Sequence, residues 1–172
     1  MLYSEMYRIT GYAATWGRPF WPGGSIVPVV LLRGAFADQL ASPNGIARVK
    51  LLWQHDATQP VGRVLALRED ERGLWYEAGI SETATGAQLR EQIRDRTLDS
   101  VSVGFVPTEY SGTDMVLIVT RAVLYELSLV TWPANAETSL QLASDATHNA
   151  TERLKRIAAA TLLRCKLMEV WV

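Results

Sequence analysis

His55, Ser102 and Glu126 are the residues whose types could together support acyl transfer. A serine hydroxyl is a weak nucleophile near neutral pH, so it needs a base within hydrogen-bond reach and a third group that orients this base. The chain contains two histidines, His55 and His148, which limits an imidazole base to two candidates. Ser102 shares one face of an expected strand with Ser100, and such serine pairs are common, so the pair alone is a weak signal.

The neighbourhoods of His55 and Glu126 add to this signal. A strand is expected over 47–55, with His55 at the end of its apolar face and a loop over 56–60 directly after it. Functional groups often lie where a rigid element meets a loop, although a half-buried structural histidine is the commoner outcome. Glu126 lies inside the apolar run 123–130, where a carboxylate needs an arginine, backbone N–H groups or an imidazole as its partner, or an edge position.

Other acids could take the place of Glu126 as the orienting group. Asp56 is a poor candidate, because neighbouring residues of a strand face opposite ways. Glu77 and Asp114 remain open as alternatives on these grounds.

Alternating apolar residues separated by turn residues predict a mainly β chain with flanking helices. Strands are expected at 5–14, 26–32, 47–55, 61–68, 74–80, 99–105, 115–120 and 122–132, a turn into a short helix at 33–40, and a longer helix at 83–96. A threonine can cap the longer helix, and Leu89 and Ile93 form an apolar i, i+4 pair in it. Polar turns are expected at 69–73 and 107–114.

Composition narrows the class of protein. The 172 residues are enough for one domain with a sizeable core, and a net charge of −1 argues against nucleic acid as the main partner. The sequence has no apolar run long enough for a membrane span and no apolar signal core at its start, so we expect a cytosolic protein without a membrane partner. The single cysteine, Cys165, allows no internal disulfide, and with only two histidines it argues against a zinc site. No cofactor or metal is expected.

Six short segments resemble the prohead (capsid maturation) proteases of tailed phages. They are Arg33-Gly34-Ala35-Phe36, Leu51-Leu52-Trp53-Gln54-His55-Asp56, Pro60-Val61-Gly62, Arg72-Gly73-Leu74, Ser102-Val103-Gly104-Phe105 and Glu126-Leu127-Ser128-Leu129-Val130-Thr131-Trp132-Pro133-Ala134-Asn135. Each segment is weak alone, and their order and spacing make the set specific. The resemblance runs from about Gly11 to Leu140, and this family is related to the herpesvirus assemblins, which are serine proteases.

The resemblance implies a fold and a set of roles. The fold would be a closed, mostly antiparallel β-barrel of assemblin type with surrounding helices, over residues 1–143, followed by a separate tail over 144–172. His55 would be the general base and Ser102 the nucleophile, with Ser100 a spacer beside it. Glu126 falls at the third position of the triad, 24 residues after Ser102. The candidate oxyanion donors are a backbone N–H group and an arginine, either Arg121 or Arg63.

The resemblance also implies substrates and partners. The enzyme would cut the scaffold or capsid precursor protein, and then itself, inside the assembling prohead in the host cytoplasm. Because relatives in the assemblin group dimerise, a homodimer is expected. Two alternatives are a catalytically inactive assembly module of the same fold and a sugar- or peptide-binding barrel that uses an aromatic loop.

The aromatic loop 16–24 and the C-terminal tail have open interpretations. We favour tryptophans that cover one end of the barrel, and the alternative is a loop that contacts substrate. After a polar linker over 144–150, the pattern of 151–172 predicts a basic amphipathic helix. That helix could pack on the barrel, or it could be a self-cleaved or scaffold-docking extension.

Overall fold

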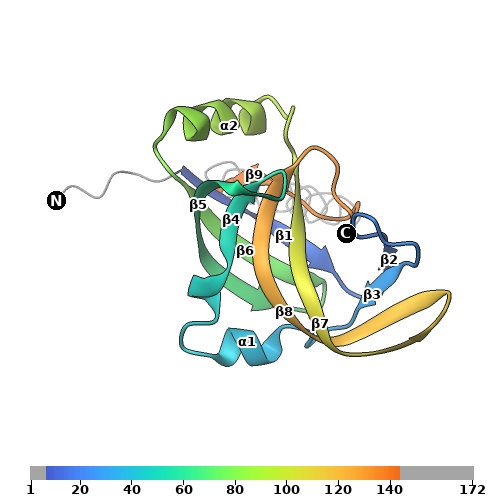
Figure 1. Ribbon diagram of the computed structural model, residues 1–172. Helices are drawn as coiled ribbons and strands as arrows, with labels where there is room; N and C mark the ends of the chain where they lie inside the picture. The colour runs from blue at the N-terminus through green and yellow to red at the C-terminus, as the bar shows by residue number, and fades with distance from the viewer. Residues whose placement is uncertain (1–6, 144–172) are drawn as a thin grey trace, which may run out of the picture. The chain divides into compact units, whose positions relative to one another are not determined.

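Strand β8 (Val116–Val130) organises the sheet in the computed structural model, which describes residues 7–143. Strand β7 (Ser100–Thr113) pairs with β8 in antiparallel fashion along its whole length. The other edge of β8 receives two strands, β3 (Val29–Leu31) and β4 (Lys50–Trp53), and both run parallel to it. The sheet is therefore mixed (Figure 1).

The remaining strands extend the sheet beyond β3 and β4, and the helices flank it. They are β1 (Tyr7–Thr15), β2 (Pro19–Phe20), α1 (Ala37–Ala41), a 3-10 turn η1 (Ile46–Arg48), β5 (Asp56–Glu69), β6 (Gly73–Ile80), α2 (Ala84–Arg94) and β9 (Gln141–Leu142). The order of pairing is β2-β3-β8-β4-β5-β6-β1-β9, with β7 on the free edge of β8. Buried alternate residues from these strands, such as Ile9, Tyr76, Val101, Leu127 and Leu129, form one apolar core.

The expected closed barrel is wrong, whereas the expectation of mostly antiparallel pairing is confirmed. The sheet curls strongly but forms a half-barrel, because its pairing order within residues 7–143 starts at β2 and ends at β9 without joining. The long strand β7, which pairs with β8 alone in this part of the chain, leaves a further open edge. Two parallel pairs of β8 make the sheet mixed, while the other six strand pairs within residues 7–143 are antiparallel. The mainly β class with flanking helices is confirmed.

A gap in the pairing of β8 is filled by the segment that leads into α1. Between the residues paired with β3 and those paired with β4, Ala122 donates its N–H to the carbonyl of Ala35 at 2.8 Å. Gln39 of α1 extends this contact: its side-chain amide accepts from the N–H of Leu124 at 2.7 Å and donates to the carbonyl of Leu124 at 2.9 Å. One side chain thus replaces a missing strand neighbour, as buried backbone groups require.

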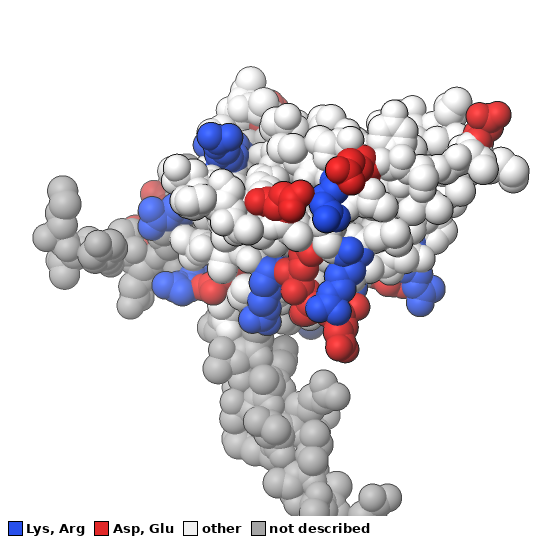
Figure 2. All heavy atoms as spheres, turned by 90° about the horizontal axis from the view of Figure 1, so that it is seen from below, with Lys and Arg blue, Asp and Glu red and all other residues white. Residues whose placement is uncertain are grey.

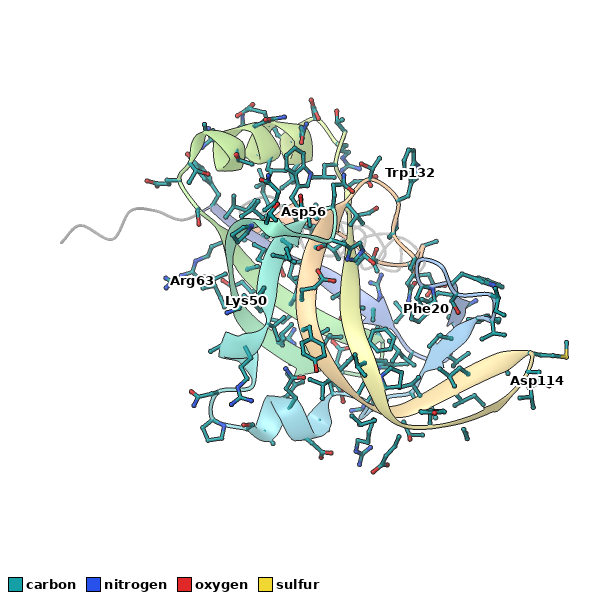
Figure 3. All side chains as sticks on the ribbon, viewed as in Figure 1. Phe20, Lys50, Asp56, Arg63, Asp114 and Trp132 are labelled. Atoms are coloured by element: carbon teal, nitrogen blue, oxygen red, sulfur yellow. The ribbon has the colours of Figure 1, made fainter. Side chains whose placement is uncertain are left out.

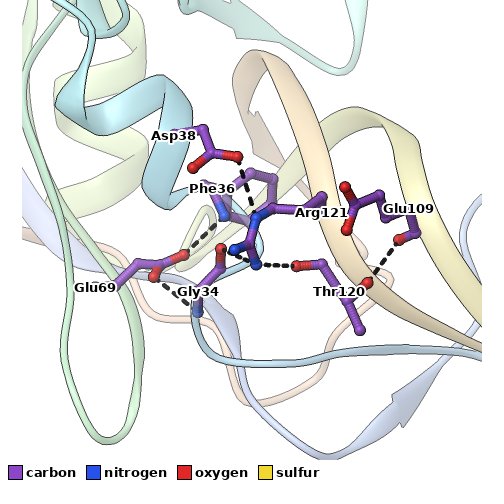
Figure 4. A network of polar contacts seen from close by, with 7 residues as sticks. All are labelled: Gly34, Phe36, Asp38, Glu69, Glu109, Thr120 and Arg121. Carbon is purple, nitrogen blue, oxygen red and sulfur yellow. Dashed lines mark hydrogen bonds and ion pairs between the residues drawn. The ribbon is translucent and has the colours of Figure 1, made fainter.

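The same segment is fixed from its other side by charged residues (Figure 4). The carboxylate of Glu69 accepts from the N–H groups of Gly34 and Phe36, at 2.8 and 2.9 Å. Gly34 has a φ of +93°, a conformation that glycine adopts without strain. Arg121 donates to Asp38 at 3.1 Å and to the carbonyl of Thr120 at 3.0 Å.

Two expected loops are strands instead. The segment 56–60 belongs to β5, which begins directly after a two-residue turn. The segment 107–114, expected as a turn, continues β7 to Thr113, and the two strands expected at 115–120 and 122–132 are the single strand β8. Their polar residues suggested turns because β7 and β8 extend as a hairpin whose outer part is exposed to solvent (Figure 1).

The longer helix is confirmed as α2, with Thr83 as its N-cap. The hydroxyl of Thr83 accepts from the N–H of Gly86 at 3.0 Å, and Leu89 and Ile93 are buried.

In the view of Figure 2, basic and acidic side chains are interleaved, as on an ordinary solvated surface. Within residues 7–143 we find no helix of the length and hydropathy that a membrane crossing requires.

Replacing Gln39 with alanine should destabilise the fold. The substitution leaves the buried N–H and carbonyl of Leu124 without their partner, and an unsatisfied buried polar group costs about 1–3 kcal/mol. Urea unfolding should therefore show a lower midpoint for Gln39→Ala. The matched control is Gln59→Ala, at an exposed position of β5, where a change within about 0.5 kcal/mol is expected. Equal midpoints for the two variants would contradict this role of Gln39.

Candidate active site

The register of three neighbouring strands brings the expected site residues together. Across β7 and β8, Ser102 pairs with Ser128, and Gly104 pairs with Glu126. On the other edge of β8, the last residue of β4, Trp53, pairs with Leu129. Because alternate residues of β8 share a face, Glu126 and Ser128 lie next to each other between Ser102 and the end of β4.

His55 reaches β8 from a strained turn. Gln54 and His55 are the two central residues of the hairpin that joins β4 to β5, with φ values of 55° and 58°. A two-residue hairpin of type I′ requires positive φ at both positions, which residues other than glycine adopt at a cost. The N–H of Gln54 donates to Leu129 O at 2.9 Å, and its side chain donates to the Thr131 hydroxyl at 2.8 Å. These bonds hold the turn against β8, so His55 does not continue the face of Trp53 as expected.

His55 and Glu126 form a direct hydrogen bond. The Nδ1 of His55 lies 2.8 Å from Oε1 of Glu126. In the neutral imidazole, an Nδ1–H that donates to the carboxylate leaves the lone pair of Nε2 free to accept a proton. The hydrogen bond raises the pKa of His55 above its ordinary value, burial lowers it, and the negative charge of Glu126 raises it further. The arrangement suits a base whose tautomer is set by a carboxylate.

Ser128 completes the support of this pair. Its hydroxyl donates to Oε2 of Glu126 at 2.5 Å and accepts from the backbone N–H of His55 at 3.2 Å. Ser128 is fully buried, so these contacts are shielded from water. Ser128 belongs to a motif that resembles the prohead proteases, but its role was not predicted from the sequence. The available signal was its position two residues after Glu126, on the same face of one strand.

Gly104 supplies the space for the carboxylate. A Cβ atom at this position would overlap Oε1 of Glu126, the atom that bonds His55. The side chain of Glu126 is 13% exposed, so the absence of a side chain on the neighbouring strand lets it lie flat against β7. The position of the Glu126 carboxylate therefore explains why the segment Ser102-Val103-Gly104-Phe105 has a glycine at position 104.

Ser102 and His55 line the same pocket, which has a volume of about 710 Å³. The Ser102 side chain forms no hydrogen bond within residues 7–143, and catalytic hydrogen bonds in ligand-free sites often form only when substrate binds. Phe20 from the aromatic loop and Trp132 from the segment after β8 line the pocket as well (Figure 3). Trp21 is a further lining residue.

The two tryptophans of the aromatic loop differ in role. Trp16 donates its indole N–H to the carbonyl of Asp70 at 2.9 Å and packs against Phe36, so it is part of the fold. Trp21 is more than half exposed and lies in the wall of the pocket.

The other candidates lie away from this pocket. Arg121 is held by Asp38 and by backbone carbonyls, and neither Arg121 nor Arg63 lines the pocket. In Figure 3, Arg63 projects on the side opposite Phe20 and Trp132, and Asp114 lies at the tip of the β7–β8 hairpin. Glu77 forms an ion pair with Arg8 at 2.6 Å.

Two further expectations concern other parts of the chain. Among residues 7–143, no group of three or more histidine, cysteine, aspartate or glutamate side chains is placed to hold a metal ion. His148 and the expected tail helix over 151–172 lie outside the described residues.

Replacing Glu126 with glutamine should lower the pKa of His55. The amide has no charge and can present an N–H group to Nδ1, which favours the wrong tautomer. Because Glu126 raises the pKa of His55, the native pair stabilises the fold fully below the unfolded pKa of about 6.5, and this contribution is lost as pH rises through the folded pKa. NMR titration of the imidazole Cε1–H signals measures this pKa, and His55→Gln assigns the signal because the chain has only two histidines. An unchanged pKa in Glu126→Gln would contradict the contact.

Replacing Gly104 with alanine should separate Glu126 from His55 without unfolding the protein. The three nearest contacts of the added methyl group are all atoms of the Glu126 side chain, which can rotate away. The pKa of His55 should therefore fall towards its ordinary value in the same titration. Gly23→Ala is the matched control, because nothing lies within 4 Å of a Cβ at that position. The role of Gly104 would be refuted by identical His55 titrations in the two variants.

The sequence is similar to known prohead proteases of phages. A family model described as the Caudovirus prohead serine protease matches residues 3–153. The chain is 28% identical over 155 residues to the prohead protease of Escherichia phage T5, covering 88% of this chain and 70% of that protein. It is 30% identical over 138 residues to the prohead protease of Enterobacteria phage HK97, covering 76% of this chain and 57% of that protein.

Among solved structures, the fold resembles a crystal structure of the KSHV protease in complex with a hexapeptide phosphonate inhibitor. The TM-score is 0.53 at 13% identity, and the match covers 79% of this chain and 64% of that one. The half-barrel therefore resembles the fold of this protease. The family model covers well over half of the sequence, and the chain therefore belongs to the Caudovirus prohead serine protease family, whose members act in phage capsid maturation.

Proposed function

We propose that this chain is a serine endopeptidase in which Ser102 is the nucleophile, His55 the general base and Glu126 the group that orients His55. The observation that carries the proposal is the geometry around His55. Its Nδ1 bonds Glu126 at 2.8 Å, and its ring and Ser102 line one pocket. These are the parts that nucleophilic catalysis by a serine requires.

The proposed reaction runs in two halves. The Ser102 hydroxyl attacks the carbonyl carbon of the scissile peptide bond while Nε2 of His55 takes its proton, and the tetrahedral intermediate expels the amine, which receives that proton from His55. A water molecule then attacks the acyl-enzyme ester with His55 again as base, which releases the acid product and restores Ser102. Throughout, Glu126 stabilises the imidazolium form of His55.

The substrate in this proposal is the scaffold or capsid precursor protein, and the enzyme also cleaves itself. The proposed place of action is inside the assembling prohead, in the host cytoplasm, and the proposed active form is a homodimer. Family membership and the names of the phage T5 and HK97 relatives support the proposed substrate and the proposed place of action. The homodimer rests on the resemblance to assemblins. The chain spans 57% of the length of the HK97 protein.

Replacing Ser102 with alanine should abolish cleavage and leave the fold intact. Intact-mass analysis of the concentrated protein, alone and with a capsid precursor, measures the products. Removal of the nucleophile or the base in a serine protease costs many orders of magnitude in rate, so His55→Gln should also be at least about 10³-fold slower. Ser100→Ala is the matched control on the same face of β7, and it should cleave normally.

Two outcomes would contradict the assignment of this chain as a serine endopeptidase with Ser102 as its nucleophile. Processing that persists in Ser102→Ala would remove Ser102 from the mechanism. A wild-type protein that is never cleaved and never cleaves the precursor would instead support an inactive assembly module of the same fold.

A further inference from the structure

The pocket beside Ser102 has walls without a fixed charge. None of the 19 residues that line it is a lysine, arginine, aspartate or glutamate, and His55 is its one titratable side chain. Across the whole chain, by contrast, 20% of residues are charged. A charged side chain that entered this pocket would lose hydration and find no opposite charge to replace it.

One wall of the pocket is aromatic and rigid. Phe20 of β2 is buried and contacts the ring of Phe105 edge to face, with ring centres 6.4 Å apart. Phe105 in turn contacts Phe36 in the core, at 6.1 Å. This chain of rings ties the wall to the core, so the wall is formed before any ligand binds.

Trp21 extends this wall towards solvent. It follows Phe20 directly, lines the pocket and is 57% exposed. The loop that carries it is held by hydrogen bonds of its own: Ser25 N–H donates to the carbonyl of Pro22 at 2.9 Å, and the Ser25 hydroxyl donates to the carbonyl of Val27 at 2.6 Å. An exposed indole beside a preformed apolar wall is suited to cover a large apolar group.

We propose that this pocket receives a large, uncharged apolar side chain of the substrate peptide, close to the scissile bond, and that Trp21 is a specificity-determining residue that packs on it. The inference rests on the proposed endopeptidase function and adds the class of substrate. The enzyme would discriminate against peptides that carry lysine, arginine, aspartate or glutamate at the corresponding position.

A peptide library tests the proposal. The wild-type protein is incubated with a library of peptides of mixed sequence, and the cleavage sites are identified by mass spectrometry. We expect one position near the scissile bond to be enriched in leucine, isoleucine, methionine, phenylalanine or tyrosine and depleted of all four charged residues. Sites at which every position tolerates charged residues as often as the library contains them would overturn the proposal.

Trp21→Glu then probes the wall directly. The measurement is the ratio of kcat/KM for two peptides that differ in one residue, leucine or lysine, at the enriched position. The variant should change this ratio by roughly tenfold or more in favour of lysine, the range over which apolar pockets discriminate. The matched control is Ile26→Glu, in the same loop but outside the pocket and 95% exposed, and it should keep the wild-type ratio. A ratio unchanged in Trp21→Glu, or changed equally in Ile26→Glu, would overturn the role of Trp21.

Failure of the proposed function is recognised separately. A small fluorophosphonate, which needs an activated serine but no large pocket, should label Ser102 in the wild-type protein and not in Ser102→Ala. Labelling of Ser102 without an apolar preference would overturn the pocket proposal alone. Absence of both labelling and cleavage would overturn the endopeptidase function, and the pocket proposal with it.

Discussion

A carboxylate on a largely buried strand must be satisfied by hydrogen bonds, and in this protein Glu126 meets that constraint with two partners. One oxygen accepts from the imidazole of His55 and the other accepts from the hydroxyl of Ser128. The same contacts that make burial of Glu126 tolerable also set the tautomer of His55 and raise its pKa. Stability and the proposed chemistry therefore depend on one group of hydrogen bonds.

The sheet is arranged so that these partners can meet. Ser102, Glu126 with Ser128, and His55 come from β7, β8 and the β4–β5 turn, which lie side by side because β8 pairs with β7 on one edge and with β4 on the other. A parallel pair such as β4–β8 needs a long connection, and the helix and long strands between them provide it. The segment around Gln39 covers the part of β8 that no strand pairs with, which keeps the edge opposite β7 satisfied.

Much of the site could be predicted from residue types, and its geometry could not. The scarcity of histidines and the isolated acid in an apolar run pointed to His55 and Glu126, and the motif around Ser102 distinguished it from Ser100. The positive φ values of the turn at His55 could not be predicted, because they depend on bonds between Gln54 and the far end of β8. Likewise, the closed barrel that the resemblance implied was wrong, because closure depends on pairing between edge strands that lie far apart in the sequence.

The two-residue turn that carries His55 has a consequence for how the chain can vary in length. An added or deleted residue between Trp53 and Asp56 would shift the register of β4 against β5 and rotate the imidazole away from β8, since one residue reverses the face of a strand. The tip of the β7–β8 hairpin, where Met115 is 80% exposed, carries no such restriction. We therefore expect insertions and fused tags to be accepted at that tip and rejected at the turn, which makes the hairpin tip the natural attachment point for a reporter or a tether.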